Sequence, residues 1–351
     1  MKRLVSLGLL ALAACSDALE QDTTAGQAIA VAESRPARLS LVSAESFEIT
    51  NTITLPNPAS GFVSGLGSVL IVPASSGVAV IDLSHSVTTV TRGIQFVLGG
   101  FSRGTAIQND SIAWVTFEMP FPPLPYGYAV WRVNYQSGDT TSIGFAGNPK
   151  AVAIAAGHVF VVTVGAGDVS WLTVIDTVLA AGPPRISVVD SIPLTGLNAG
   201  GITRGGDGYL YVVSSGALTS GGMTEGRLAV VDPVARRELA IVNGLGNSLG
   251  PPVYHPSGRI LIPSVNGILE VNPGTRSVTI GPSKGVKPAG EYSNVIALDQ
   301  RGRLYTLVDH CADPTQPPGA VQVLDPPPGY GLSTSIPIGS CPTGAAAAVM
   351  P

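Results

Sequence analysis

The chain has 351 residues, of which 43 are Gly and 29 are Pro, and only 12% are charged. So many helix breakers exclude a helical bundle or a coiled coil. The 45% share of apolar residues excludes a disordered chain, and the net charge of -4 argues against a protein that binds nucleic acid through phosphates. The composition therefore favours an all-β chain with tight turns.

The first fifteen residues have the organisation of an export signal. Lys2 and Arg3 are followed by a short apolar stretch over 4–14, which is too short to cross a bilayer. The small residues before Cys15 make the segment similar to the lipobox of bacterial lipoproteins, and the resemblance implies that Cys15 becomes the lipid-modified first residue. Ser16 follows the cysteine, which by the same resemblance implies sorting to the outer membrane. The alternative is an ordinary secretory signal with a chance cysteine.

The rest of the chain divides into a short tether and a repeated β pattern. Residues 16–26 are small and polar, and they predict a tether between the lipidated cysteine and the fold. A strand that closes in Asp or Asn then recurs about every 40 to 56 residues, at 78–82, 129–134, 172–176, 228–232, 268–272 and 321–325. The closing Asp or Asn is typical of a turn, because its side chain accepts hydrogen bonds from the backbone that follows.

Two further strands precede each of these runs, and one follows it. The immediately preceding strands begin in turn residues and cover 67–71, 110–114, 157–161, 208–212, 258–262 and 302–306. A strand rich in small residues lies before each, as at 150–154. The units are thus predicted to be four-stranded antiparallel blades, with strands named A to D from the axis outward, and radial repetition of such blades makes a β-propeller.

The two chain ends supply a seventh blade, and six or eight blades are the alternatives if one unit is miscounted. Residues 26–32, 38–42 and 47–54 match strands B, C and D, while 343–349 matches strand A. We therefore expect the carboxyl-terminal strand to pair with the amino-terminal strands and close the ring. The predicted organisation is a signal peptide over 1–14, a lipidated cysteine and tether over 15–26, and one propeller domain over 27–351.

The strand motifs resemble those of the YVTN/YncE-like seven-bladed propellers. The G-x-L-x-V pattern stands at 208–212 and the x-V-x-V-[VIL]-D pattern at 228–232, and the resemblance extends over nearly all of the mature chain. It departs from the family in its turns, which lack a strict S-P-D-G. The resemblance implies the architecture, whereas one propeller fold hosts many unrelated activities.

Propeller topology assigns each connection to a face. The B–C and D–A connections share one face, here called the upper face, and the A–B and C–D turns share the lower face. The longest B–C loops, at 118–127, 214–226 and 309–319, make the upper face the candidate for binding. Cys311 and Cys341 are both expected there at neighbouring blades, and export to an oxidising compartment predicts a disulfide between them. A metal site beside His310 is the alternative.

Four asparagines recur about ten residues before strand B in their blades. They are Asn57, Asn148, Asn198 and Asn247, which places them in D–A connections near the mouth of the axial channel. Their side-chain carbonyls could bind a hard cation such as Ca²⁺, or a polar ligand, and metal-dependent lactonase propellers use a similar mixture of Asn and acidic residues. Glu291 is the nearest acidic candidate, and the alternative is that asparagine serves only as a turn former.

No catalytic motif stands out from this pattern. The G-x-S-x-G match at 100–104 has no helix after it, as a nucleophile elbow requires. We therefore expect a non-catalytic lipoprotein of the bacterial envelope, without a cofactor, that binds or scaffolds a protein, peptide or glycan partner with its upper face. It would be held to the membrane by its lipids, facing the periplasm or the cell surface. The alternatives are a lactonase-like or quinoprotein-like enzyme at the channel mouth, and a structural subunit of an envelope complex.

Overall fold

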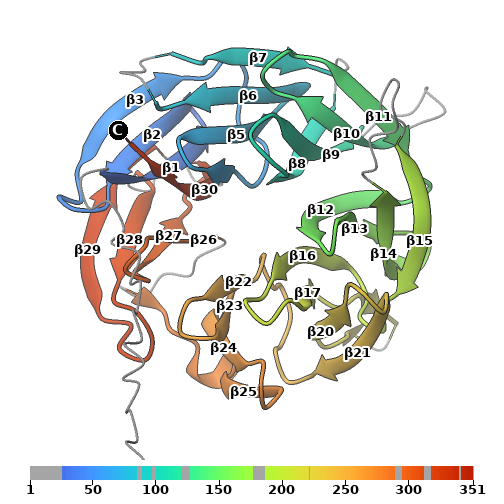
Figure 1. Ribbon diagram of the computed structural model, residues 1–351. Helices are drawn as coiled ribbons and strands as arrows, with labels where there is room; N and C mark the ends of the chain where they lie inside the picture. The colour runs from blue at the N-terminus through green and yellow to red at the C-terminus, as the bar shows by residue number, and fades with distance from the viewer. Residues whose placement is uncertain are drawn as a thin grey trace, which may run out of the picture.

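The fold is known from a computed structural model, which describes residues 26–84, 89–96, 100–119, 127–176, 186–220, 222–288, 295–311, 318–339 and 341–350. The predicted signal peptide, Cys15 and Glu291 lie outside these ranges. Seven four-stranded antiparallel sheets stand around a common axis (Figure 1). The predicted all-β, seven-bladed propeller is confirmed.

The blades follow the order of the chain, with strand A innermost. Blade 1 contains β4 (Ser64–Leu66), β5 (Val69–Ala74), β6 (Gly77–Asp82) and β7 (Arg92–Gln95), and blade 2 contains β8 (Phe101–Ile107), β9 (Ile112–Glu118), β10 (Tyr128–Asn134) and β11 (Thr140–Gly144). Blade 3 contains β12 (Asn148–Ala155), β13 (His158–Val164), β14 (Ser170–Asp176) and β15 (Ser187–Pro193). Blade 4 contains β16 (Ala199–Arg204), β17 (Leu210–Ser214), β20 (Arg227–Asp232) and β21 (Arg237–Val242).

The remaining blades complete the ring. Blade 5 contains β22 (Val253–His255), β23 (Arg259–Ser264), β24 (Gly267–Asn272) and β25 (Ser277–Ile280), and blade 6 contains β26 (Ile296–Leu298), β27 (Leu304–Val308), β28 (Ala320–Leu324) and β29 (Leu332–Pro337). Blade 7 joins β30 (Pro342–Val349) to β1 (Gln27–Ser34), β2 (Ala37–Ser43) and β3 (Ile49–Thr54). A small hairpin of β18 (Leu218–Thr219) and β19 (Gly222–Met223) extends blade 4, and two 3-10 turns are η1 (Ala166–Asp168) and η2 (Pro282–Lys284).

The hydrophobic core is divided among the interfaces between blades. Each of the seven apolar clusters in the described part of the chain joins two consecutive blades, and together they go all the way round the ring. For example, Leu39 and Ile53 of blade 7 pack with Leu70 and Ile81 of blade 1. Because alternate residues of a strand point to opposite faces, every middle strand serves two interfaces at once. This is why the B and C strands are apolar at successive positions.

The ring closes where the carboxyl-terminal strand meets the amino-terminal one. β30 pairs antiparallel with β1, so that Ala345 lies opposite Val31 and Ala348 opposite Ala28. Small side chains suit β30 because it lies next to the axis (Figure 1). The predicted closure by the last strand is confirmed.

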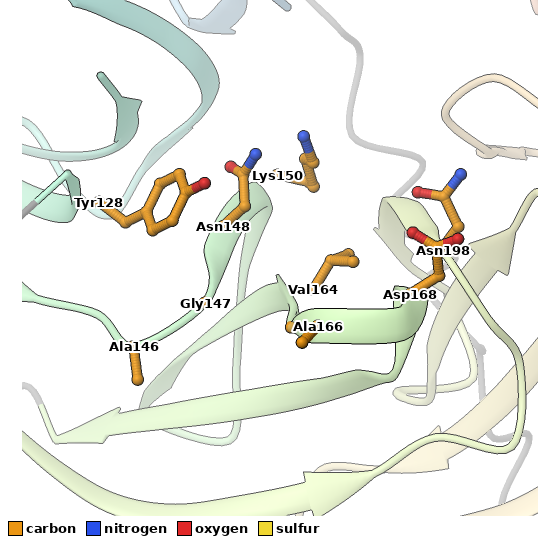
Figure 2. Close-up of a pocket in the computed structure, with 10 residues that line it drawn as sticks. Tyr128, Ala146, Gly147, Asn148, Lys150, Val164, Ala166, Asp168 and Asn198 are labelled. Atoms are coloured by element: carbon orange, nitrogen blue, oxygen red, sulfur yellow. The ribbon is translucent and has the colours of Figure 1, made fainter. Parts of the chain in front are cut away.

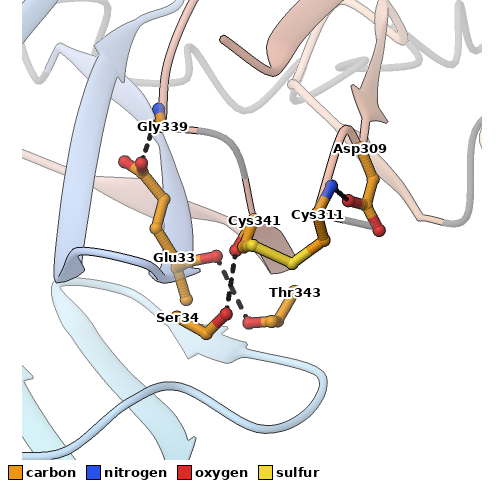
Figure 3. Close-up of a disulfide and its surroundings, with 8 residues drawn as sticks. Glu33, Ser34, Asp309, Cys311, Gly339, Cys341 and Thr343 are labelled. Atoms are coloured by element: carbon orange, nitrogen blue, oxygen red, sulfur yellow. Dashed lines mark hydrogen bonds between the residues drawn. A yellow bond between two sulfur atoms is a disulfide. The ribbon is translucent and has the colours of Figure 1, made fainter. Parts of the chain in front are cut away.

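A disulfide and a buried carboxylate hold the segment that leads into β30 (Figure 3). Cys311 and Cys341 are joined by a disulfide, with a Cα–Cα distance of 4.7 Å. The backbone N–H of Ser34 donates to the carbonyl of Cys341 at 2.9 Å. Glu33, which has no solvent exposure, accepts from the backbone N–H of Gly339 at 2.6 Å. The start of β30 is therefore tied to both blade 6 and blade 7.

The lower face holds the short turns that the sequence predicts. The side chains of Asp82, Asn134, Asp232 and Asn272 each accept from a backbone N–H two residues on, and the Ser43 hydroxyl does the same in blade 7. The described chain also starts and ends on this face, because Met350 donates to the carbonyl of Gly26 at 2.7 Å. In the described part of the chain, no helix has the length and apolar character needed to cross a membrane.

Candidate functional site

A polar pocket of about 340 Å³ opens on the upper face, where blades 2, 3 and 4 meet (Figure 2). The D–A connection into blade 3 and the B–C loop of that blade form its floor, and the connection into blade 4 forms one wall. The lining residues are Tyr128, Ala146, Gly147, Asn148, Lys150, Val164, Gly165, Ala166, Asp168 and Asn198.

A carboxylate at the end of β9 organises one side of the pocket. Glu118 Oε1 accepts from Arg103 Nε at 2.9 Å and Nη2 at 2.5 Å, and its Oε2 accepts from Asn148 Nδ2 at 2.9 Å. Lys150 Nζ lies 3.5 Å from the same Oε2. Partial burial alone would raise the pKa of Glu118, but the hydrogen bonds from Arg103 and Asn148 and the charges of Arg103 and Lys150 outweigh it and hold the pKa below its ordinary value.

Bulges in the innermost strands bring these cations to the channel mouth. The pairing of β8 with β9 shifts between Ser102 and Thr105, so Arg103 and Gly104 are set against a single residue of β9. The pairing of β12 with β13 shifts between Pro149 and Ala151, which leaves Lys150 as the extra residue. Bulges redirect side chains that a regular ladder would alternate. They account for the two basic side chains that meet Glu118 at the upper end of the axis.

Gly104 allows the two strands to come this close. A Cβ added at Gly104 would stand 2.8 Å from the Cα of Ala151 in the next blade. The glycine of the G-x-S-x-G match therefore serves the packing of β8 against β12. Ser102 in the same motif is fully buried within a strand, and its hydroxyl donates to the carbonyl of Gly77 at 2.8 Å. This is not the strand-to-helix turn of a nucleophile elbow.

The opposite side of the pocket consists of Asp168 and Asn198. The backbone N–H of Asn198 donates to the carbonyl of Asp168 at 2.7 Å. Both residues have left-handed backbones, with φ of 62° and 54°, a conformation that Asp and Asn tolerate better than most residues. The buried Ser170 hydroxyl donates to the carbonyl of Asp168 and accepts from the backbone N–H of Ala199, which locks the two loops together. Within the described ranges, the Asp168 carboxylate takes part in no ion pair.

Trp171 packs directly behind the floor of the pocket. A Cβ added at Gly147 would lie 2.8 Å from Trp171 Cη2, and one added at Gly165 would lie 2.8 Å from Cζ3. The indole N–H donates to Thr173 Oγ1 at 3.0 Å, which holds the ring in place. The indole therefore occupies the space below these two lining glycines, where a side chain would otherwise stand.

The structure brings two of the sequence-predicted residues into one pocket. Asn148 is the first residue of β12, and Asn198 directly precedes β16. Asn148 Oδ1 is buried and has no hydrogen-bond partner among the described residues, because Glu118 orients the amide by its nitrogen. Asn247 lies in the next D–A connection and does not line the pocket. Glu291 falls outside the described residues, so its proposed role stays a prediction.

Sequence reasoning did not single out Tyr128, Lys150 or Asp168 as site residues. Asp168 ends the short turn η1, but nothing local in the sequence shows that this loop meets Asn198. Lys150 stands two residues after Asn148. A regular strand and a strand with a bulge would point its side chain to different faces of the sheet, and the sequence does not show which applies. No group of three or more His, Cys, Asp or Glu side chains that could hold a metal occurs within the described ranges.

The axis itself has a different chemistry from the pocket. A cavity of about 140 Å³ on the axis is lined by all seven blades, mostly with apolar groups such as Val63, Val152, Ile202, Val253 and Ile296. The hydroxyl of Thr105, which also lines it, donates to the carbonyl of Phe62 at 2.8 Å. Of these two cavities in the described part of the chain, the polar one therefore lies beside the axis, between blades, and the axial one is mainly apolar.

Comparison with known proteins identifies the fold. No protein-family model and no curated protein matches the chain. Among solved structures, it is similar to Kuenenia stuttgartiensis hydrazine synthase, with a TM-score of 0.63 and 16% identity over 83% of this chain and 90% of that one. It is also similar to the dihydro-heme d1 dehydrogenase NirN in complex with DHE, with a TM-score of 0.55 and 15% identity over 91% and 74%.

A further similar structure is that of Citrobacter koseri AztD, with a TM-score of 0.53 and 12% identity over 93% of this chain and 99% of that chain. At identities this low, the likeness extends to the arrangement of the blades and to nothing finer. These three proteins share one architecture and are named for different activities or systems, and one fold commonly hosts several functions. By its strands and by these comparisons, the chain is a seven-bladed β-propeller.

Proposed function

We propose that this protein is a lipoprotein of the bacterial envelope whose propeller, of the YVTN/YncE-like kind, is a non-catalytic binding module. The lipobox-like residues before Cys15 support the anchor, and the strand motifs support the family. The module binds a protein, peptide or glycan partner on its upper face. Two or three acyl chains on Cys15 would hold it stably at the membrane, whereas one chain would bind marginally.

The observation that carries this proposal is the open pocket between blades 2, 3 and 4. Its polar side chains come from several blades, so a rigid ring of sheets positions them relative to one another. Binding groups on connections over a rigid scaffold are the usual arrangement for recognition. The pocket faces away from the lower face, where the described chain begins at Gly26. A tether leaving there would keep the upper face accessible.

The competing hypothesis of an enzyme at the channel mouth has less support. A lactonase-like or quinoprotein-like site needs polar or metal-binding groups that converge on the axis, and the axial cavity is lined mainly by valine, isoleucine and alanine. Glu118, an acidic side chain beside the mouth, is already held by Arg103 and Asn148. These contacts suit a structural or binding role better than acid–base chemistry.

Site-directed photo-crosslinking in intact cells tests the proposal. A photo-reactive phenylalanine derivative at the exposed Ala166 should capture a defined partner, because Ala166 lines the pocket. The same derivative at Val234, which is 79% exposed in a turn of the lower face, is the matched control and should not capture it. Capture from Val234 alone, or from neither position, would contradict a binding role for the upper face.

A further inference from the structure

The pocket carries opposite charges at its two ends. On the side of blade 2, the positive charges of Arg103 and Lys150 stand against the single carboxylate of Glu118, which leaves an excess of one positive charge. On the side of blade 4, the carboxylate of Asp168 has no ion pair within the described part of the chain. Figure 2 shows Lys150 above Val164 and Asp168 to the right of Val164, beside Asn198.

The contacts of Glu118 leave Lys150 the more available of the two cations. Arg103 makes two hydrogen bonds to Glu118 at 2.9 and 2.5 Å, whereas Lys150 approaches it only at 3.5 Å. Lys150 also lines the pocket, while Arg103 does not. The Lys150 ammonium has three N–H donors and only a long contact with Glu118, so N–H groups remain available to bind a second anion. The positive end is therefore presented to an occupant by Lys150.

A ligand that carries only a negative charge, or only a positive charge, complements one end of this pocket and is repelled by the other. An anion attracted to Lys150 meets the carboxylate of Asp168, and a cation attracted to Asp168 meets the ammonium of Lys150. A neutral ligand uses neither charge. A ligand that carries both charges complements both ends, and placing like charges apart and unlike charges together is how sites discriminate between partners.

Resting on the proposed binding role, we propose that this pocket takes a small zwitterion, the chemistry of a free amino acid or a short peptide. The ligand carboxylate binds Lys150, and the ligand ammonium binds Asp168. The side-chain amide of Asn198 lies beside Asp168 and adds donors and acceptors at that end. The volume of about 340 Å³ lies at the lower end of the range for small-molecule sites, which suits a ligand of this size.

Calorimetry on the full-length protein in detergent tests the charge requirement with four probes. They are alanine, dialanine, N-acetyl-dialanine and dialanine amide, of which the last two each lack one terminal charge. We expect a zwitterion to bind about tenfold more tightly than either blocked form, because each blocked form loses a hydrogen bond between charged groups. Tighter binding of alanine identifies a single amino acid as the source, and tighter binding of dialanine identifies a peptide.

Two variants assign the ends. Lys150→Met should bind dialanine about tenfold more weakly and lose its preference for dialanine over the amide. Asp168→Asn keeps a residue that tolerates the left-handed backbone, and it should lose the preference for dialanine over the acetylated form. The matched controls Lys284→Met and Glu225→Gln remove exposed charges elsewhere on the upper face and should leave both affinities unchanged.

The inference is overturned if no zwitterion binds at millimolar concentration, if the blocked forms bind as well as the tighter-binding zwitterion, or if neither pocket variant changes the preferences. These outcomes do not depend on the proposed role as a whole. A partner captured from Ala166 alongside a failed calorimetry series would leave the binding module standing and remove only its zwitterion. If capture from Ala166 failed but dialanine bound selectively, the zwitterion site would stand and the proposed macromolecular partner would be removed.

Discussion

Removing the Cys311–Cys341 disulfide should destabilise the whole propeller rather than its seam alone. The bond joins residues 30 positions apart, and in the chain-entropy account a closed loop of that length restricts the unfolded chain by about 3.6 kcal/mol at 25 °C. In the folded protein, β29 ends at Pro337 and β30 begins at Pro342. This short connection keeps β30 near its place even without the bond, so the loss should appear mainly in global unfolding.

The perturbation must remove the bond without adding a second defect. Cys311 is exposed and can become serine, whereas Cys341 is 1% exposed and should become alanine, because a buried hydroxyl without a partner would carry its own penalty. The double variant Cys311→Ser/Cys341→Ala and the native protein are unfolded in denaturant and followed by tryptophan fluorescence. We expect the free energy of unfolding to fall by about 3 to 4 kcal/mol.

The native protein in strong reductant is the control, and it should match the double variant. A fall of less than about 1 kcal/mol would refute the loop-entropy reasoning. It would mean that the unfolded chain keeps blade 6 and β30 together by other contacts. A large increase in proteolysis confined to β30 would instead show that the bond protects the seam locally.

Three other predictions concern the anchor and the pocket. Cys15→Ala should leave the protein unacylated, and mass spectrometry of membrane fractions should find no lipid-modified form; continued acylation would contradict the lipobox assignment. Because the folded-state pKa of Glu118 is lowered, its contribution to stability is present above the ordinary pKa of 4.5 and is lost as the pH falls below it. Glu118→Gln should therefore reduce the dependence of unfolding free energy on pH in that acid range, and an unchanged profile would count against the network. Gly147→Ala should lower the free energy of unfolding by about 1 to 3 kcal/mol and shift Trp171 emission, since the new methyl group would clash with the indole. A variant as stable as the native protein would show that the residues of the pocket floor can move to accommodate the methyl group.

Much of the fold could be predicted because its signals are local and repeated. Runs such as Leu228 to Asp232 combine apolar strand residues with a closing side chain that makes the turn, and each signal lies within a few residues. Even the closure was accessible, because the pattern lacks one strand A at the start and has one left over at the end. The partnership of β30 with β1 follows from counting strands.

The candidate site was only partly predictable. Asn148 and Asn198 could be placed near the channel mouth because they recur at one position of the repeat. Lys150 reaches the pocket through a bulge, and a one-residue slip in pairing reverses the side of the sheet on which a residue stands. Asp168 meets Asn198 across two blades through a single backbone hydrogen bond.

The amino-acid sequence by itself predicted seven blades, with six or eight as alternatives, and it assigned the connections to the two faces. Both predictions depend on periodicity, on turn residues and on the alternation of strand direction, all of which are local. The disulfide between Cys311 and Cys341 was expected from their common face and from an oxidising compartment, with a metal site beside His310 as the alternative. Only the tertiary structure decided that Lys150, Asp168 and Asn198 surround one pocket with opposite charges at its ends. The physical reason is that the packing angle between blades and the bulges of the innermost strands set those positions, and neither leaves a pattern along the chain.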